Sequence, residues 1–249
     1  MSPDIPVEVV YQENFAEIYD DVYRSHRDYA GEAERIRRLV RERRPTAVSL
    51  LDVACGTGEH LVHLSKEFEV QGVDLAEPML RAAAAKLGAD VVHRGDMRDL
   101  GLGRRFDAVS CLFSSIAYLG GVDELRAATR SMAAHLVPGG VMVVEPWILR
   151  EDWNGGDLVQ ASFTSGTTKV SRMGRWYTVN GRSRVEMHYL VADPSAEPAT
   201  AVRHFVNQQD LALFSREEYE AAVTGAGCTV EYLPDGYADR GVFVGVRQT

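Results

Sequence analysis

The sequence predicts an α/β fold built around a doubly wound, mostly parallel sheet. Three observations support this prediction. Apolar runs of strand length alternate with amphipathic segments between residues 45 and 148, a glycine-rich turn follows the first run, and acidic residues end successive runs. Strands that alternate with helices indicate right-handed crossovers between parallel neighbours. The 249 residues are enough for one such domain with an insertion.

An N-terminal helical segment is expected before the sheet, over residues 11–44. Tyr19, Val22 and Tyr23 follow the i, i+3, i+4 spacing of one helix face, and an Arg/Glu-rich amphipathic pattern continues beyond them. Pro45 ends this pattern, because the residue before a proline disfavours the α conformation. We interpret this part of the chain as a helical lid.

The sheet is expected to begin at residues 47–54, an apolar run typical of a strand buried on both faces. A glycine turn at residues 55–58 follows it, and strands and helices then alternate. The later strands of this region are expected at 70–75, 90–93, 106–113 and 141–147, and the helices at 59–68, 77–87 and 122–136.

The pattern changes after Trp147, because residues 157–213 show the alternation of antiparallel strands. The dipeptide Asn180-Gly181 between two such segments is a strong hairpin signal. The α/β pattern then resumes with a helix at 215–226 and strands at 229–232 and 241–246. We therefore interpret residues 1–249 as a single domain with a lid (1–44), a core (45–148 and 213–249) and an antiparallel β insertion (149–212).

Composition and charge narrow the classes of function. Acidic side chains number 36 and basic ones 27, which gives a formal charge of −9. This balance disfavours a nucleic-acid partner, which needs a concentrated basic surface. The three cysteines form no CxxC pair or Cys/His cluster, so neither a disulfide framework nor a metal site is expected. Without a signal-peptide pattern or a long apolar run, we expect a cytoplasmic protein with no membrane partner.

The turn Cys55-Gly56-Thr57-Gly58 follows a strand and opens a helix, an arrangement that brings backbone close to a ligand. A dinucleotide site would need a third glycine where this chain has Leu61, which disfavours a nicotinamide dehydrogenase. Asp74 lies 18 residues after Gly56, at the end of the next strand, where a carboxylate can accept the hydroxyls of a ribose.

Acidic residues recur at the carboxyl ends of consecutive predicted strands. Asp52 precedes the glycine turn, Asp74 ends the second strand, and Asp96-Met97 follow the third. Ligands of open α/β sheets bind in the crevice at these strand ends. The spacing therefore predicts a nucleotide-containing cofactor at this edge of the sheet.

These motifs resemble those of class I S-adenosylmethionine-dependent methyltransferases, which have a Rossmann-like sheet. The likeness covers residues 45–147 and includes D-x-x-C-G-T-G, the acid ending strand two, G-D-M, F-D-A-V and L-x-P-G-G. It implies S-adenosyl-L-methionine as cofactor, with its methionine part at the glycine turn, its ribose at Asp74 and its adenine near Met79, Asp96 and Met97. The full cofactor-binding set implied is Tyr19, Asp52, Ala54, Gly56, Gly58, Asp74, Leu75, Met79, Asp96, Met97 and Leu112.

A narrower resemblance extends over nearly the whole chain, including the insertion. The segments LLDVACGTGEHL, FSSIAYL, VRHF and RGVFVGV are similar to those of sugar-nucleotide N-methyltransferases that methylate dTDP-linked amino deoxysugars in antibiotic pathways. The resemblance implies N-methylation, twice over, of the amino group of a dTDP-amino sugar. It also allows a homodimer.

The same resemblance suggests residues for chemistry and for the acceptor. Tyr11, Tyr118 and Glu145 would lie near the reacting nitrogen, where Glu145 either orients the amine, receives its proton or makes a buried structural hydrogen bond. For Tyr11 and Tyr19, packing of the lid onto the sheet is an equally good interpretation. The substrate-binding set implied is Tyr11, Trp147, Arg172, His188 and Arg240, with Arg240 on the diphosphate. Solvent exposure is the alternative for Arg172, His188 and Arg240.

Two other functions remain open from the sequence. An O-methyltransferase acting on a sugar or polyketide hydroxyl would need a base or a metal, and no such cluster is evident. A non-catalytic S-adenosylmethionine-binding module is the second. Departures from the family at residues 148–150 and 235–239, both expected beside the acceptor, indicate that the sugar or the position methylated differs from that of the relatives.

Overall fold

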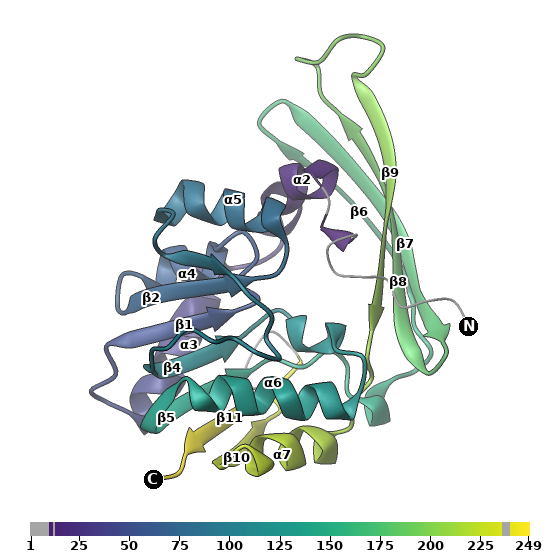
Figure 1. Cartoon of the computed structure of the whole chain (residues 1–249). Helices are drawn as coiled ribbons and strands as arrows, with labels where there is room; N and C mark the ends of the chain where they lie inside the picture. The colour runs from purple at the N-terminus through teal and green to yellow at the C-terminus, as the bar shows by residue number, and fades with distance from the viewer. Residues whose placement is uncertain (1–9, 12, 236–239) are drawn as a thin grey trace.

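The computed structural model describes residues 10, 11, 13–235 and 240–249. Residues 1–9, 12 and 236–239 lie outside the described part, and with them the start of the predicted lid and most of the loop 235–239. The described chain forms two separate sheets, and the lid helix α2 lies between the smaller sheet and the main body (Figure 1).

The main sheet is mixed, as predicted, and mostly parallel. Its strand order is β10-β11-β5-β4-β1-β2-β3. The five strands from β1 to β5 run parallel, whereas β11 is antiparallel to both β5 and β10. The strands are β1 (Ser49–Val53), β2 (Glu69–Asp74), β3 (Val92–Arg94), β4 (Phe106–Cys111), β5 (Leu136–Val144), β10 (Cys228–Leu233) and β11 (Val242–Arg247). The first strand is central and fully buried, as its apolar run predicts.

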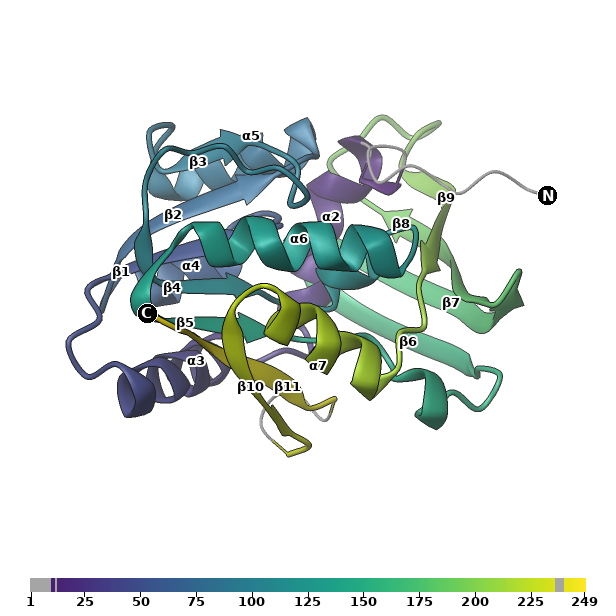
Figure 2. The same cartoon turned by 60° about the horizontal axis from the view of Figure 1, so that its bottom comes forward.

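Helices cover both faces of this sheet (Figure 2). One apolar cluster joins the sheet to α6 and α7, and a second joins it to α3, α4 and α5. The helices are α2 (Glu13–Arg24), α3 (Tyr29–Arg43), α4 (Glu59–Leu64), α5 (Glu77–Leu87), α6 (Val122–Ala134) and α7 (Arg216–Gly225), with short 3-10 turns η1 (Ser115–Tyr118) and η2 (Arg150–Asp152). This three-layer arrangement confirms the predicted doubly wound fold.

The predicted helical segment over residues 11–44 is two helices rather than one. The break between α2 and α3 falls at Asp28, whose carboxylate caps α3 by accepting a hydrogen bond from the backbone N–H of Gly31 at 3.0 Å. A capping aspartate has a non-helical backbone, so it ends one helix as it starts the next. The break lets α2 leave the body and reach the smaller sheet.

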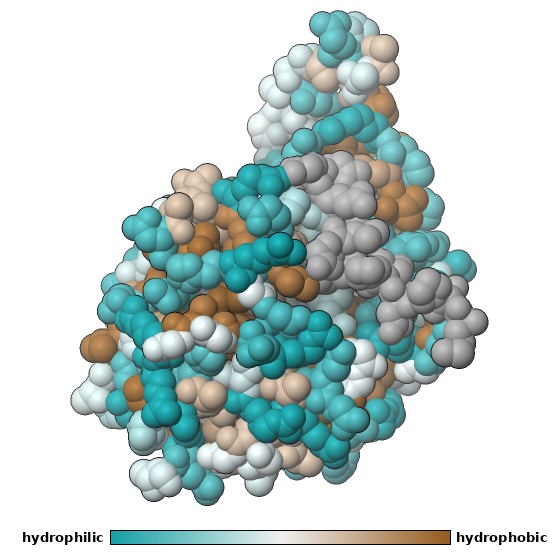
Figure 3. Space-filling model, viewed as in Figure 1, coloured by the Kyte–Doolittle hydropathy of each residue, from teal (hydrophilic) through white to brown (hydrophobic). Residues whose placement is uncertain are grey.

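The insertion forms a four-stranded antiparallel sheet, β6 (Leu158–Ser165), β7 (Thr168–Val179), β8 (Arg182–Ala192) and β9 (Val202–Leu211). Asn180 and Gly181 have φ values of 51° and 76°, the two left-handed positions that a two-residue hairpin turn requires. Apolar residues on the inner face of this sheet pack against α2. Its outer face carries exposed hydrophobic side chains, some visible at the upper right of Figure 3; the largest exposed ones are Leu158, Met173, Leu190, Val202 and Val206.

Within the described ranges, no helix is long and apolar enough to cross a membrane. The three cysteines are buried and unpaired, in agreement with the expected lack of a disulfide framework.

Candidate active site

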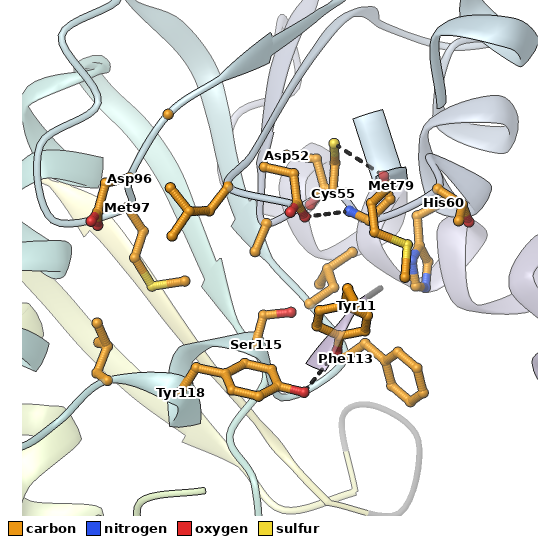
Figure 4. A pocket seen from close by; sticks show the side chains of 18 of the residues that line it. Tyr11, Asp52, Cys55, His60, Met79, Asp96, Met97, Phe113, Ser115 and Tyr118 are labelled. Atoms are coloured by element: carbon orange, nitrogen blue, oxygen red, sulfur yellow. Dashed lines mark hydrogen bonds between the residues drawn. The ribbon is translucent and has the colours of Figure 1, made fainter. Parts of the chain in front are cut away.

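A cavity of about 380 Å³ lies at the carboxyl ends of β1, β2 and β4, under the lid (Figure 4). Its volume is within the range of small-ligand sites. Most of the residues expected to bind a cofactor line it: Tyr19, Asp52, Ala54, Gly56, Asp74, Leu75, Met79, Asp96, Met97 and Leu112. Tyr11 and Tyr118 line it too. The structure therefore brings together residues from the lid, three parallel strands and the turn η1.

The glycine turn and Asp74 form one hydrogen-bonded unit. The Asp74 carboxylate accepts backbone N–H groups from Gly56 and Ala76, each at 2.8 Å. Gly56 has φ 56° and no atom stands within 4 Å of where a Cβ would lie, so its backbone faces open space. Gly58 does not line the cavity. A Cβ there would lie 2.9 Å from Leu87 Cδ1, so this glycine serves helix packing instead.

Asp52 is a buried carboxylate at the floor of the cavity. It is 1% exposed and accepts a hydrogen bond from Ser110 Oγ at 2.7 Å. Burial raises the pKa of Asp52 to about 6. Burial thus disfavours the ionised form of this carboxylate. A positively charged ligand nearby would favour the ionised form again, so the site suits a cation.

Asp96 and Met97 lie at one end of the cavity, and His60 lies at the other end (Figure 4). Hydrogen bonds from Arg98 hold the pKa of Asp96 below its ordinary value, so Asp96 is ionised at neutral pH. Arg98 also contacts Glu124 at 2.7 Å. This end therefore offers a fixed carboxylate beside an apolar side chain.

Two tyrosine hydroxyls meet inside the cavity. Tyr11 Oη lies 2.8 Å from Tyr118 Oη, and the Tyr11 ring also contacts Tyr19 edge-on, with 5.9 Å between centroids. Burial raises the pKa of both Tyr11 and Tyr118 well above the ordinary value. Both phenols therefore stay protonated at neutral pH, and they can position a polar group but do not supply a base.

Glu145 lies behind the cavity wall and holds a strained turn. Its Oε2 accepts the backbone N–H of Phe113 at 2.5 Å, and Phe113 and Ser114 both have left-handed backbones, with φ of 54° and 62°. Its Oε1 is buried without a hydrogen-bond partner among the described residues. Burial raises the pKa of Glu145. Glu145 does not line the cavity, but the residue that it holds, Phe113, does.

Three arginines lie around Tyr23, whose ring contacts that of Phe113 edge-on, and we call Arg27, Arg172 and Arg240 the arginine cluster. Arg27 stacks on the ring of Phe113 at 4.0 Å, and Arg240 on the ring of Trp147 at 4.2 Å. Arg240 Nη1 also donates to Ser114 Oγ at 2.9 Å. Burial raises the pKa of Tyr23, and the charges of Arg172, Arg240 and Arg27 oppose that rise, so all three guanidinium groups lie in the neighbourhood of this phenol. The Arg172 guanidinium lies 6.0 Å from the centre of the Tyr23 ring.

The other arginines of the insertion are engaged elsewhere. Arg182 donates to the carbonyls of Leu119 and Asp210, and Arg184 forms a close pair with the Asp210 carboxylate at 2.6 Å. Arg175 lies on the outer face beside Glu186, at 3.6 Å. Only Arg172, which is on the inner face of β7, joins the cluster, so the arginines of the insertion do not form one binding surface.

The structure does not support His188 as a substrate contact. Met187 and Tyr189 on either side of it are buried against the lid, so strand alternation turns His188 to the exposed outer face. There it stacks on His204, with 5.4 Å between ring centroids. Gly241, which follows Arg240, packs closely against another side chain, because a Cβ at Gly241 would lie 2.4 Å from Tyr232 Oη.

Sequence reasoning missed several residues that line the cavity, chiefly His60, Tyr29, Phe113 and Arg98. His60 Nε2 is hydrogen-bonded to Glu32 at 2.8 Å, and its ring contacts Tyr29 edge-on. The one available signal was its position, since His60 lies in the first turn of the helix that follows the glycine motif. No group of three or more potential metal ligands occurs in the part of the chain that the structure describes.

The cavity residues fit S-adenosylmethionine. A buried acid anchored by two backbone N–H groups can receive ribose hydroxyls, an open glycine backbone can approach the methionine part, and methionine and leucine side chains offer an apolar wall for an adenine. The buried Asp52 suits the positive charge of a sulfonium. These observations belong to this chain alone, and comparison with known proteins extends them.

Residues 50–140 match the family described as "Methyltransferase domain". The chain is 47% identical over 243 residues to the dTDP-3-amino-3,4,6-trideoxy-alpha-D-glucopyranose N,N-dimethyltransferase of Streptomyces venezuelae, covering 95% of this chain and 99% of that protein. It is 41% identical to the dTDP-4-amino-2,3,4,6-tetradeoxy-D-glucose N,N-dimethyltransferase of Saccharopolyspora spinosa, covering 96% and 94%. The S-adenosylmethionine-bound structure of CalS10, an amino pentose methyltransferase from Micromonospora echinaspora, superimposes with a TM-score of 0.84 at 37% identity and full coverage of both chains.

Fold, cavity and relatives together define an enzyme, an S-adenosylmethionine-dependent methyltransferase. Within this class, the chain belongs to the family of the dTDP-amino-sugar N,N-dimethyltransferases.

Proposed function

We propose that this enzyme methylates the amino group of a dTDP-linked amino deoxysugar, adding two methyl groups in turn, in the biosynthesis of an antibiotic or related secondary metabolite. The observation that carries the proposal is the 47% identity over 95% of the chain, a stretch that includes the small sheet. The curated relatives act on 3-amino and 4-amino sugars.

The proposed chemistry is an in-line displacement, in which the free electron pair of a neutral amine forms a new C–N bond. When bound, S-adenosylmethionine supplies the methyl group and takes the electrons of the broken C–S bond. The residues of this chain contribute chiefly alignment, which alone can lower a barrier substantially. Tyr11 and Tyr118 lie where the lid meets the cavity floor, so their protonated hydroxyls would hold the amine in line.

Glu145 is suited to stabilise the positive charge that the nitrogen acquires when it accepts the methyl group. Its Oε1 is buried without a hydrogen-bond partner among the described residues, and its raised pKa means that a cation nearby would favour ionisation. In this proposal the carboxylate stabilises the ammonium product through space, from behind Phe113, and the proton leaves to solvent. The carboxylate is fixed in place, because its other oxygen is held by Phe113.

The arginine cluster would bind the diphosphate of the acceptor. The protein as a whole is acidic, so two phosphate charges need a local group of cations. Arg172 and Arg240 both lie in the neighbourhood of Tyr23, and Arg240 also stacks on Trp147; neither arginine lines the cavity. A sugar bridging the two regions would place its amine at the tyrosine pair and its diphosphate at the arginines.

The outer face of the small sheet is the surface proposed for a homodimer. Its exposed hydrophobic residues include Met173, Leu190 and Val206, which lie on neighbouring strands. Arg175 and Glu186 share one cross-strand position on that face. A twofold axis along the strands would set Arg175 of each copy over Glu186 of the other, which favours self-association by charge.

The proposed function is tested by incubating the protein with labelled S-adenosylmethionine and a panel of dTDP-sugars bearing an amine at C3 or C4, or a hydroxyl there. We expect methyl transfer to an amine only, with a dimethylated end product by mass spectrometry. Preference for a hydroxyl, or for an unphosphorylated sugar, would overturn the assignment.

A further inference from the structure

The lid helix α2 is held to the body through a polar network that the proposed chemistry does not use. One side of α2 is apolar, and Phe15, Ile18 and Val22 are buried against the small sheet. Its other side presents Asp20 and Arg24 to the body. The lid is thus fixed to the small sheet by apolar packing and to the body by charge.

Lys86, on α5, is the centre of this network. Its Nζ donates to Asp20 Oδ2 at 2.5 Å, to Glu59 Oε1 at 2.6 Å and to the backbone carbonyl of Thr57 at 2.8 Å. These three acceptors match the three N–H donors of an ammonium group, so each donor has a partner. The lysine therefore ties together the lid, the glycine turn and helix α4.

Two further contacts close the network. Thr57 Oγ1 donates to Asp20 Oδ1 at 2.5 Å, and Arg24 donates to both oxygens of Glu59, at 2.8 and 2.6 Å. Burial alone would raise the pKa of Glu59, but the hydrogen bonds from Arg24 and Lys86 outweigh it and lower that pKa to about 2. Glu59 is therefore ionised near neutral pH, and the network joins two acidic side chains to two basic ones.

The network also borders the cofactor site. Thr57 and Glu59 both line the cavity, and Tyr19, the residue before Asp20, lines it from the lid. Helix α2 therefore covers this side of the cavity for as long as the contacts of Asp20 and Arg24 hold it against the body.

We propose that Lys86 is a positioning residue, the central contact of a latch that keeps the lid closed over S-adenosylmethionine and S-adenosylhomocysteine. Without the ammonium group, Asp20 and Glu59 face each other as like charges, which favours the open lid. The proposal rests on the cofactor site but not on the identity of the acceptor sugar. Its test uses cofactor ligands alone, so it can fail or succeed independently of the proposed substrate.

The test measures dissociation and association rate constants of S-adenosylmethionine and S-adenosylhomocysteine by stopped-flow displacement, in the wild type and in Lys86→Met. Because apparent affinity falls with the fraction of molecules in the binding-competent state, we expect both dissociation rate constants to rise about tenfold or more. The association rate constants should not fall. The matched control is Arg37→Met, which removes an ion pair with Glu34 on the surface of α3.

Asp20→Asn is a second, independent variant for this test, in case Lys86→Met fails to fold. It should also speed dissociation, and the double variant should be less than twofold faster than Lys86→Met, because both changes break one contact. In steady state, the KM for S-adenosylmethionine should rise while the KM for the acceptor stays unchanged. Dissociation rate constants within twofold of the wild type in both single variants, or fully additive effects in the double variant, would overturn the latch.

Discussion

The hydroxyl oxygen of Tyr11 lies 2.8 Å from that of Tyr118, and this contact joins the lid to the floor of the cavity. The two residues are 107 positions apart, so only the closed arrangement of lid and body creates the pair. Their rings meet edge-on, with 5.9 Å between centroids. The hydrogen bond between them therefore joins the lid to the body at the place where the methyl group is expected to be transferred.

The first prediction concerns this pair. Because burial raises the pKa of the Tyr118 phenol, Tyr118→Phe removes a hydrogen bond but no base. We expect kcat to fall by less than about 100-fold, the lower end of what losing a true general base costs. The shape of the pH–rate profile from pH 7 to 9 should not change. Tyr11→Phe is the matched partner, and a loss beyond about 1,000-fold in either variant would indicate a base.

The second prediction concerns Asp52 and pH. Its folded pKa of about 6 is raised above the ordinary value, so the folded protein binds this proton more tightly than the unfolded chain does. The contribution of Asp52 to stability therefore improves as pH falls through 6. Cofactor binding has the opposite dependence, because a cation prefers the ionised carboxylate: affinity should be full above pH 6 and fall by up to about tenfold per pH unit below it.

Calorimetry between pH 5 and 8 checks this, with Asp52→Asn as the control. The wild type should lose affinity for S-adenosylmethionine toward pH 5, and the asparagine variant should bind more weakly but without that slope. A flat wild-type profile, or an unchanged slope in the variant, would show that Asp52 is not the group that titrates.

Much of the fold could be predicted because its signals are local. The Asn180-Gly181 turn dictates its own hairpin through two left-handed residues, and helix 77–87 was predicted with the bounds that α5 has. The cavity lining was also predictable, because strand ends that follow a parallel pattern must meet at one edge. The start of β5 could not be predicted in this way. Residues 136–140 extend the strand through a Pro-Gly-Gly segment that reads as a turn, with a register irregularity opposite Phe106 and Ala108.

The acceptor side was predicted less well, because it depends on which way each side chain points. Arg172 and Arg175 are three residues apart, so strand alternation puts them on opposite faces of β7, but it does not tell which face turns inward. The same holds for His188, which lies on the outer face. The cluster formed by Arg27, Arg172 and Arg240 joins three distant segments, and no periodicity in the chain indicates that they converge.

The third prediction separates two roles of Glu145. Glu145→Gln keeps an oxygen for the Phe113 N–H and removes a charge whose burial raises its pKa, so the free energy of unfolding at pH 7 should not fall. Glu145→Ala leaves that N–H unpaired and should lower it by about 1–3 kcal/mol. If the carboxylate stabilises the ammonium product, Glu145→Gln should still lower kcat, measured beside a urea denaturation series. A Gln variant with wild-type kcat would leave Glu145 a purely structural residue.

The last prediction uses two arginines of one strand as a matched pair. Arg172 belongs to the arginine cluster, whereas Arg175 faces outward beside Glu186. The two substitutions to alanine therefore remove the same side chain from opposite faces of β7. Losing a charge-assisted phosphate contact should cost about 1.5–3 kcal/mol, which is about a 10- to 150-fold rise in the KM for the dTDP-sugar. Arg175→Ala should change that KM by less than about twofold, since exposed pairs contribute little.

Arg240→Ala should behave as Arg172→Ala does, and neither change should alter the affinity for S-adenosylmethionine, because neither residue lines the cofactor cavity. A sugar lacking the nucleotide diphosphate gives the decisive comparison: its turnover, however weak, should be insensitive to Arg172→Ala and Arg240→Ala. If the arginine variants impair that sugar as much as the dTDP-sugar, or if Arg175→Ala raises the KM as much as Arg172→Ala, the cluster does not bind the diphosphate. Its arginines would then act only in packing the Phe113, Trp147 and Tyr23 rings.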